Sequence, residues 1–140
     1  MDKGISVIIC CYNSQSRLFD TLNYIARQEV SGFNIEVVLI DNASKDNTVQ
    51  FANQYWKSFN TPFNMKIVEE LKPGLSNARK KGIDSSKYEF LIFCDDDNHL
   101  KTNYCKTVYN ELNNNLEVGI LGGWSSPKFN AKPPSWFNEI

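Results

Sequence analysis

Residues 90–97 read FLIFCDDD, so five apolar residues lead directly into three aspartates. A short, continuous apolar run is typical of a strand that is covered on both faces of a sheet. Three adjacent carboxylates repel one another, and the usual reason for tolerating them is a divalent cation with a phosphorylated ligand. We therefore expect Asp95, Asp96 and Asp97 to form a binding site at the end of a buried strand.

Comparable runs recur along the chain, and they are short and rich in β-branched residues: residues 5–10, 35–40, 65–68 and 118–121. Apolar residues at helical spacing lie between the runs, in residues 18–26, 49–59, 75–83 and 100–112. We expect Ser14 or Ser16 to cap the first helix. The alternation predicts an α/β fold with five strands, in which an open, mostly parallel sheet carries helices on both faces.

Polar side chains follow four of the predicted strands, at the point where each strand ends. They are Tyr12 and Asn13, Asp41 and Asn42, residues 72–74, and residues 95–98. The carboxyl ends of parallel strands meet at one edge of a sheet, and ligands of open α/β sheets bind beyond that edge. The sequence therefore predicts one binding site built from several strand ends.

The composition is that of one soluble globular domain, with 140 residues, 41% of them hydrophobic and 13% aromatic. A net charge of -1 gives no bias toward polyanions, so nucleic acid is not an expected partner. No stretch is long enough for a transmembrane segment, and the first residues lead into a strand instead of a signal peptide. These features predict a cytoplasmic protein.

The cysteines, Cys10, Cys11, Cys94 and Cys105, have no CxxC spacing, which argues against a metal or disulfide framework. Cys10 and Cys11 are neighbours and should point to opposite faces of a strand. We expect reduced cysteines that pack as small apolar residues, as in a reducing compartment.

Several common site motifs are missing from the sequence. GxGxxG does not follow the first strand and GxxxxGK[ST] does not occur, which disfavours dinucleotide and P-loop sites. The single histidine, His99, gives little support to a Ser/His/Asp triad, and we expect it to be a rim residue. The acidic run also lacks the ligand spacing of an EF-hand.

Four motifs occur in a fixed order: SVIICCYN at residues 6–13, VLIDNASKDNT at 38–48, GLSNARKKG at 74–82 and FCDDD at 93–97. Together they resemble the family 2 glycosyltransferases of the GT-A fold. The resemblance covers residues 5–123, which in that family form the Rossmann-like, nucleotide-sugar-binding half. Residues 124–140 would then begin an acceptor-side portion, and we expect the chain to be a truncated piece of a longer protein.

The resemblance implies a nucleobase site at the ends of the first two strands. Tyr12 matches the aromatic residue on which the base stacks, with a ring that covers the core as the alternative. Cys10 belongs to the same site. Asp41 matches the carboxylate that accepts the imide N–H of uracil in relatives that use UDP-sugars. Asn42 both accepts and donates, so the choice of base is less determined than with an acid.

The resemblance also implies a metal and diphosphate site at the aspartates, which match the DxD motif. Asp97 is the expected direct ligand of Mn²⁺ or Mg²⁺, while Asp95 or Asp96 binds ribose or reaches the metal, directly or through water. Arg79 is expected to reach the diphosphate or to brace the acidic residues, with a solvated helix face as the alternative. Asp46 and Thr48 are expected to cap a helix instead of binding ligand.

The implied function is transfer of a sugar from a nucleotide diphosphate sugar, with UDP-sugar favoured, to a saccharide or lipid-linked acceptor. Inversion and metal dependence are part of the same expectation. No general base can be assigned, and we expect it beyond Ile140. Peripheral association with the cytoplasmic face of a membrane is compatible with such an acceptor.

Two other readings remain open. The chain can be a noncatalytic nucleotide-sugar-binding module or an inactive fragment, since no base is assigned. It can also be a different metal-dependent phosphate enzyme on an α/β sheet, such as a nucleotidyl transferase. The order of the strand-end motifs favours the glycosyltransferase over the latter.

Overall fold

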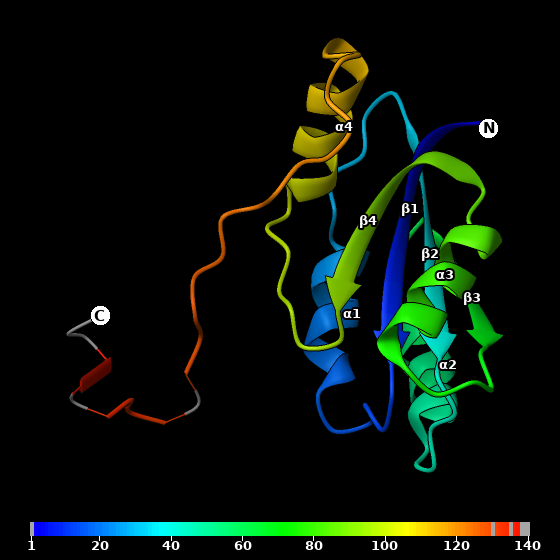
Figure 1. Ribbon diagram of the computed structural model, residues 1–140, viewed down its shortest axis with the longest axis vertical. Helices are drawn as coiled ribbons and strands as arrows, with labels where there is room; N and C mark the ends of the chain where they lie inside the picture. Colours follow the sequence, from blue (N-terminus) through cyan, green and yellow to red (C-terminus); the bar gives the residue numbers. More distant parts are fainter. Residues whose placement is uncertain (1, 130, 135, 138–140) are drawn as a thin grey trace.

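The computed structural model describes residues 2–129, 131–134 and 136–137. Within this part of the chain, strands and helices alternate (Figure 1). The strands are β1 (Asp2–Cys11), β2 (Asn34–Asp41), β3 (Asn64–Glu69) and β4 (Tyr88–Asp95). The helices are α1 (Leu18–Ala26), α2 (Thr48–Ser58), α3 (Leu75–Ser85) and α4 (Tyr104–Asn114).

The strands form one parallel sheet in the order β3-β2-β1-β4. All four arrowheads point the same way in Figure 1. Near the end of β1, Cys11 pairs with Asp41 of β2, and Cys10 pairs with Asp95 of β4. This register brings the carboxyl ends of the three strands to the same edge, as the sequence predicted.

Helices cover both faces of the sheet, which confirms the predicted architecture. On one face, apolar residues of α1, α2 and α4 pack with Val7 and Ile9 of β1. On the other face, Ala78 of α3 packs with Ile8 of β1. The central strand β1 is therefore buried from both sides, which explains why its sequence is nearly continuously apolar.

Helix α3 lies very close to the sheet at Gly82. A Cβ atom at this position would stand 2.4 Å from Cγ2 of Ile8, so no larger side chain fits without a shift. Glycine at this position therefore permits the close packing of α3 on β1.

The predicted fifth strand is wrong, because residues 118–121 form no strand in the structure. Ile120 is 91% exposed, and the segment leaves α4 and runs away from the sheet (Figure 1). An apolar run becomes a strand only when a sheet edge pairs with its backbone, and here that pairing is not made. The run alone did not reveal this.

The predicted serine cap of α1 is also wrong. The N-cap residue is Arg17, which makes no capping hydrogen bond with its side chain. The hydroxyl of Ser14 instead contacts Tyr12 in its own loop and Asp96 in the loop after β4. Leu100 lies before α4, although it packs against the core. At α2 the N-cap residue is Asn47, which makes no side-chain capping hydrogen bond, so the expected cap by Asp46 and Thr48 is wrong too. Asp46 nevertheless accepts a hydrogen bond from the backbone N–H of Thr48 at the start of the helix.

None of the helices in the described part of the chain combines the length and apolarity needed to cross a membrane. Each of the four cysteines is free and at least half-buried. Cys11 and Cys94 belong to the core on the α1 side, whereas Cys10 packs on the α3 side. The prediction that Cys10 and Cys11 point to opposite faces is confirmed.

A buried acid, Glu36, joins the strands near their amino ends. Its carboxylate accepts hydrogen bonds from the Ser6 hydroxyl at 2.6 Å and the Lys87 N–H at 2.6 Å, and pairs with Lys66 at 3.0 Å. Burial alone would raise the pKa of Glu36, but these partners outweigh burial and lower it. The charged form of Glu36 therefore stabilises the fold.

Replacement of Glu36 tests this network. Because its pKa is lowered in the folded chain, its contribution is full above the ordinary carboxyl pKa and is lost as pH falls through the lowered value. Glu36→Gln should reduce the free energy of unfolding by about 1 to 2 kcal/mol near neutral pH, and by less near pH 3. Urea unfolding at both pH values measures this. Glu89→Gln, at an exposed site on β4, is the control, and an equal loss in both variants would contradict the prediction.

Candidate functional site

Two loops at the carboxyl edge of the sheet are tied together by hydrogen bonds. Residues 12–17 follow β1 and residues 42–47 follow β2. The backbone N–H of Asn13 donates to the Ser44 hydroxyl at 3.0 Å, and the Asn13 side chain accepts from the Lys45 N–H at 2.7 Å. Asn13 has a φ of 52°, a left-handed conformation that asparagine tolerates. Asn13 therefore fixes the turn after β1 and ties it to the loop after β2.

The three consecutive aspartates do not behave alike. Asp95 and Asp97 are exposed, whereas Asp96 is buried. Arg17 holds Asp96 with two hydrogen bonds, from Nε at 2.9 Å and from Nη2 at 2.7 Å, and the Ser14 hydroxyl also donates to it. The hydrogen bond from Arg17 to Asp96 raises the pKa of Arg17. Asp96 is thus satisfied within the protein, and Asp95 and Asp97 remain open to ligand.

Arg79 lies beside the acidic residues, which fits one of the three possibilities that the sequence left open for it. Its Nη2 is 3.8 Å from Oδ1 of Asp95, and its guanidinium lies 5.6 Å from the centre of the Phe93 ring. Both charged side chains are about half exposed, so their attraction is weak and can be exchanged for another anion. The position fits the expectation that Arg79 braces the acidic residues, and its contact with a diphosphate stays a prediction.

Cys10 faces the same side of the sheet as Arg79 and Asp95. The pKa of the Cys10 thiol is raised, mainly by burial. The positive charge of Arg79 lowers this pKa, and the negative charge of Asp95 raises it further. A raised pKa keeps the thiol protonated near neutral pH, which argues against Cys10 as a nucleophile. Its place in the nucleotide-sugar site stays a prediction.

Asp41 carries a buried oxygen without a partner. The residue is only 6% exposed, and its Oδ1 has no hydrogen-bond partner among the described residues. An unsatisfied buried acceptor costs about 1 to 3 kcal/mol, which a ligand N–H can offset. Asp41 also lines a hollow of about 540 Å³ together with Ser44 and Glu69. The predicted contact with a base N–H remains a prediction, and this oxygen provides an acceptor for it.

Asn42 has a structural task that its sequence position did not reveal. Its amide nitrogen donates to the backbone oxygens of Glu70 at 2.9 Å and Lys72 at 2.8 Å, and its Oδ1 accepts from the Gly74 N–H at 2.8 Å. Gly74 needs this support, because its φ is 125° at the start of α3. Asn42 therefore fixes the β3–α3 loop, and one lone pair of its oxygen is left for a ligand.

Tyr12 stands at the rim and is 51% exposed. A residue this open does not close the core, which weakens the alternative role considered for it. The Tyr12 backbone is held at both ends, since its N–H donates to the Ser14 hydroxyl at 3.1 Å and its carbonyl accepts from Arg17 Nη2 at 3.3 Å. The ring is free while its backbone is fixed.

His99 does not join the aspartates in a metal site. Its ring stacks on Tyr24 with centroids 4.7 Å apart, and its Nε2 is 3.7 Å from Asp20. Over the residues that the structure describes, no group of three or more His, Cys, Asp or Glu side chains is arranged to hold a metal. Two open carboxylates nevertheless fit Mg²⁺ or Mn²⁺, which take one or two carboxylates and complete their shell with phosphate oxygens and water.

Sequence reasoning missed Arg17 and assigned Ser14 to a cap. Arg17 lies 79 positions from Asp96 and Ser14 lies 82 positions away. Neither residue belongs to a motif with a known spacing to the acidic run. The available signal was the three-acid run itself, because a buried member of such a run requires a cationic partner from elsewhere in the chain.

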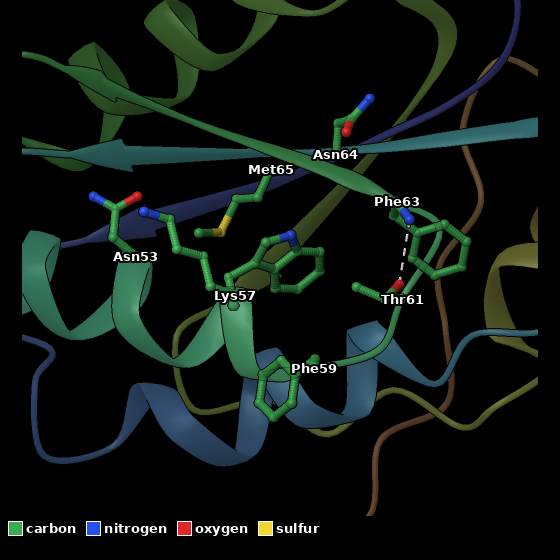
Figure 2. A pocket seen from close by; sticks show the side chains of 8 residues that line it. Asn53, Lys57, Phe59, Thr61, Phe63, Asn64 and Met65 are labelled. Atoms are coloured by element: carbon green, nitrogen blue, oxygen red, sulfur yellow. Dashed lines mark hydrogen bonds between the residues drawn. The ribbon is translucent and has the colours of Figure 1, made fainter.

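A second hollow of about 310 Å³ lies between α2 and β3 (Figure 2). Asn53 and Lys57 line it from α2, and Met65 lines it from β3. None of the predicted site residues borders it. Asn53 lines both this hollow and the one beside Asp41, so the two hollows are neighbours.

Comparison with known proteins identifies the family. Residues 6–137 match the family model described as Glycosyl transferase family 2. Glycosyltransferase GlyG of Streptococcus pneumoniae serotype 4 is 26% identical over 125 residues, which are 89% of this chain and 40% of GlyG. Poly(ribitol-phosphate) beta-N-acetylglucosaminyltransferase TarS of Staphylococcus aureus is 29% identical over 134 residues, which are 96% of this chain and 23% of TarS. The chain spans less than half the length of either relative.

Solved structures show the same arrangement of strands and helices. S. aureus TarS 1-349 in complex with UDP matches with a TM-score of 0.69 and 26% identity, over 79% of this chain and 32% of that one. The mannosyltransferase PcManGT from Pyrobaculum calidifontis, in complex with GDP-Man and Mn²⁺, matches with a TM-score of 0.62 and 24% identity. The match covers 69% of this chain and 28% of PcManGT, and it is evidence for the fold alone. The chain belongs to glycosyltransferase family 2 and has the α/β architecture of the GT-A fold.

Proposed function

We propose that this chain binds a nucleotide diphosphate sugar, with UDP-sugar favoured, as the donor half of a metal-dependent glycosyltransferase. The acceptor would be a saccharide or a lipid-linked saccharide. The observation that carries the proposal is the gathering of Tyr12, Asp41, Asp95 and Asp97 at the carboxyl edge of one parallel sheet. S. aureus TarS, which is 26% identical over 79% of this chain, is known in complex with UDP and with UDP-GlcNAc, which supports the choice of donor.

The base would lie against Tyr12. An exposed ring on a fixed backbone offers a flat face at a low entropic cost, because only the side chain remains to be ordered. Asp41 would accept an N–H of the base with its unpartnered oxygen. Asn42 would support this pocket by holding the loop before α3. We propose that its contribution to recognition of the base is smaller than that of Asp41.

The diphosphate would lie over the exposed aspartates. Asp97 would be the direct ligand of Mn²⁺ or Mg²⁺, and Asp95 would support the same ion. Such an ion, when bound, neutralises negative charge that develops on the departing nucleoside diphosphate. Arg79 would leave its weak pairing with Asp95 and bind a phosphate oxygen through its planar fork of donors.

Every residue named in this proposal acts on the donor. Transfer with inversion also needs a group that takes the proton of the acceptor hydroxyl, and we assign that group to none of the residues of this chain. Donor binding and turnover are therefore separate proposals. A noncatalytic nucleotide-sugar-binding module is the second candidate, and it predicts the same binding without release of the sugar.

Metal-dependent nucleotide binding is the first test. Calorimetry with UDP, GDP and dTDP, each with and without Mn²⁺, should show tighter binding in the presence of Mn²⁺, with UDP favoured. Asp97→Ala should abolish this Mn²⁺ dependence with little change in melting temperature, because the residue is exposed. Asp84→Ala, in an exposed ion pair on α3, is the matched control. Retained Mn²⁺ dependence in Asp97→Ala would move the ligand role to another residue.

Stacking of the base is tested at Tyr12. Tyr12→Ala should weaken the binding of each nucleotide by about 1 to 3 kcal/mol, the usual scale of base-aromatic stacking. Tyr12→Phe keeps the ring and should bind with nearly the original affinity. Calorimetry measures both variants. Equal affinity of the alanine variant and the unchanged protein would remove Tyr12 from the site.

A further inference from the structure

The middle aspartate of the acidic run connects two loops at the rim. Both of its carboxylate oxygens are used by the β1–α1 loop, because Arg17 Nε binds Oδ1 while Arg17 Nη2 and the Ser14 hydroxyl bind Oδ2. Asp96 lies between Asp95 and Asp97. Whatever fixes the Asp96 side chain therefore also fixes the backbone that carries both exposed carboxylates.

The same two partners hold the backbone of Tyr12. The Ser14 hydroxyl accepts from the Tyr12 N–H at 3.1 Å, and Arg17 Nη2 donates to the Tyr12 carbonyl at 3.3 Å. Arg17 Nη1 reaches the Asn13 carbonyl at 3.4 Å. The guanidinium of Arg17 thus contacts both Tyr12, the proposed base-binding residue, and Asp96 of the acidic loop, although these two residues lie far apart in the sequence.

We propose that Arg17 is a positioning residue that fixes the distance between Tyr12 and the exposed pair Asp95 and Asp97. This inference rests on the proposed function, because it concerns the two ends of the same donor site. A nucleoside diphosphate bridges those ends with its base and its diphosphate. If the free protein already holds both ends at the right separation, less of the binding free energy is lost in ordering the loops.

Arginine suits this task better than lysine. Its rigid fork binds both oxygens of Asp96 and still has donors for two carbonyl groups, whereas an ammonium group is a point charge on a flexible stem. The Arg17 side chain is 44% exposed, so its replacement leaves the apolar core intact, but it removes the cation that balances buried Asp96 and should lower the melting temperature. Ligand binding is therefore compared at a temperature at which every variant is folded.

The test compares a ligand that spans both ends with ligands that occupy one end. Calorimetry or NMR titration would measure UDP with Mn²⁺, uridine alone, and pyrophosphate with Mn²⁺. The variants are Arg17→Ala and Arg17→Lys, with Arg27→Ala as the control at the other, exposed end of α1. Melting temperatures are recorded for each protein.

For Arg17→Ala we expect the affinity for UDP with Mn²⁺ to fall about tenfold, while the affinities for uridine and for pyrophosphate with Mn²⁺ change by less than about twofold. Arg17→Lys should fall between the alanine variant and the unchanged protein. Arg27→Ala should bind all three ligands normally. Unchanged UDP affinity in Arg17→Ala would overturn the inference, and so would a loss for one fragment as large as the loss for UDP.

Hydrogen exchange of the ligand-free chain separates this inference from the proposed function. If the unchanged protein binds no nucleotide with Mn²⁺, the proposed function fails. Arg17→Ala should still speed amide exchange both in residues 12–17 and in residues 95–98, whereas Arg27→Ala should not. Exchange that stays unchanged in residues 95–98 would overturn the inference by itself.

Discussion

The parallel pairing of β1 with both of its neighbours is the constraint on which the rest of the structure depends. β1 is central and buried on both faces, so its register with β2 and β4 decides which loops meet. The pairing of Cys11 with Asp41 and of Cys10 with Asp95 brings the loops that follow β1, β2 and β4 to the carboxyl edge of the sheet. A shift of one residue would exchange the two faces of β1, so Ile8 would lose its close fit against Gly82 and Ser6 its hydrogen bond to Glu36, and these contacts protect the geometry of the site.

Five acidic residues of the core and of the carboxyl edge differ in their partners. Glu36 and Asp96 are buried, and each has hydrogen bonds and a cation to balance its charge. Such pairs hold the fold and the rim in place, and removal of one partner would leave an uncompensated charge. Asp95 and Asp97 are exposed, and Asp41 keeps an unpartnered oxygen. Within the described part of the chain, the Asp95 side chain has only its weak pairing with Arg79, and we propose these last three acids as the contacts of a cationic or N–H-bearing ligand.

The sequence predicted the parts of this structure that depend on local pattern. Alternating apolar runs and helical periods predicted the parallel sheet with helices on both faces, and the residues after each run predicted the edge of the site. Contacts between residues far apart in the sequence could not be predicted, because no local spacing encodes them. Examples are the hydrogen bonds of Arg17 with Asp96 and of Asn42 with the loop before α3. The run at residues 118–121 failed for the same reason, since a strand requires a paired edge as well as apolar residues.

Paramagnetic NMR of the chain with UDP and Mn²⁺ tests the central claim most directly, because Mn²⁺ broadens the signals of nearby amides wherever it binds. We predict selective broadening of amides in residues 95–98, together with UDP-induced shifts in residues 12–14 and 41–43. Amides at the opposite edge, such as those of Gly4, Asn34 and Tyr88, should stay sharp. Broadening centred on that opposite edge or on the hollow between α2 and β3 would contradict a donor site at the carboxyl ends of the strands.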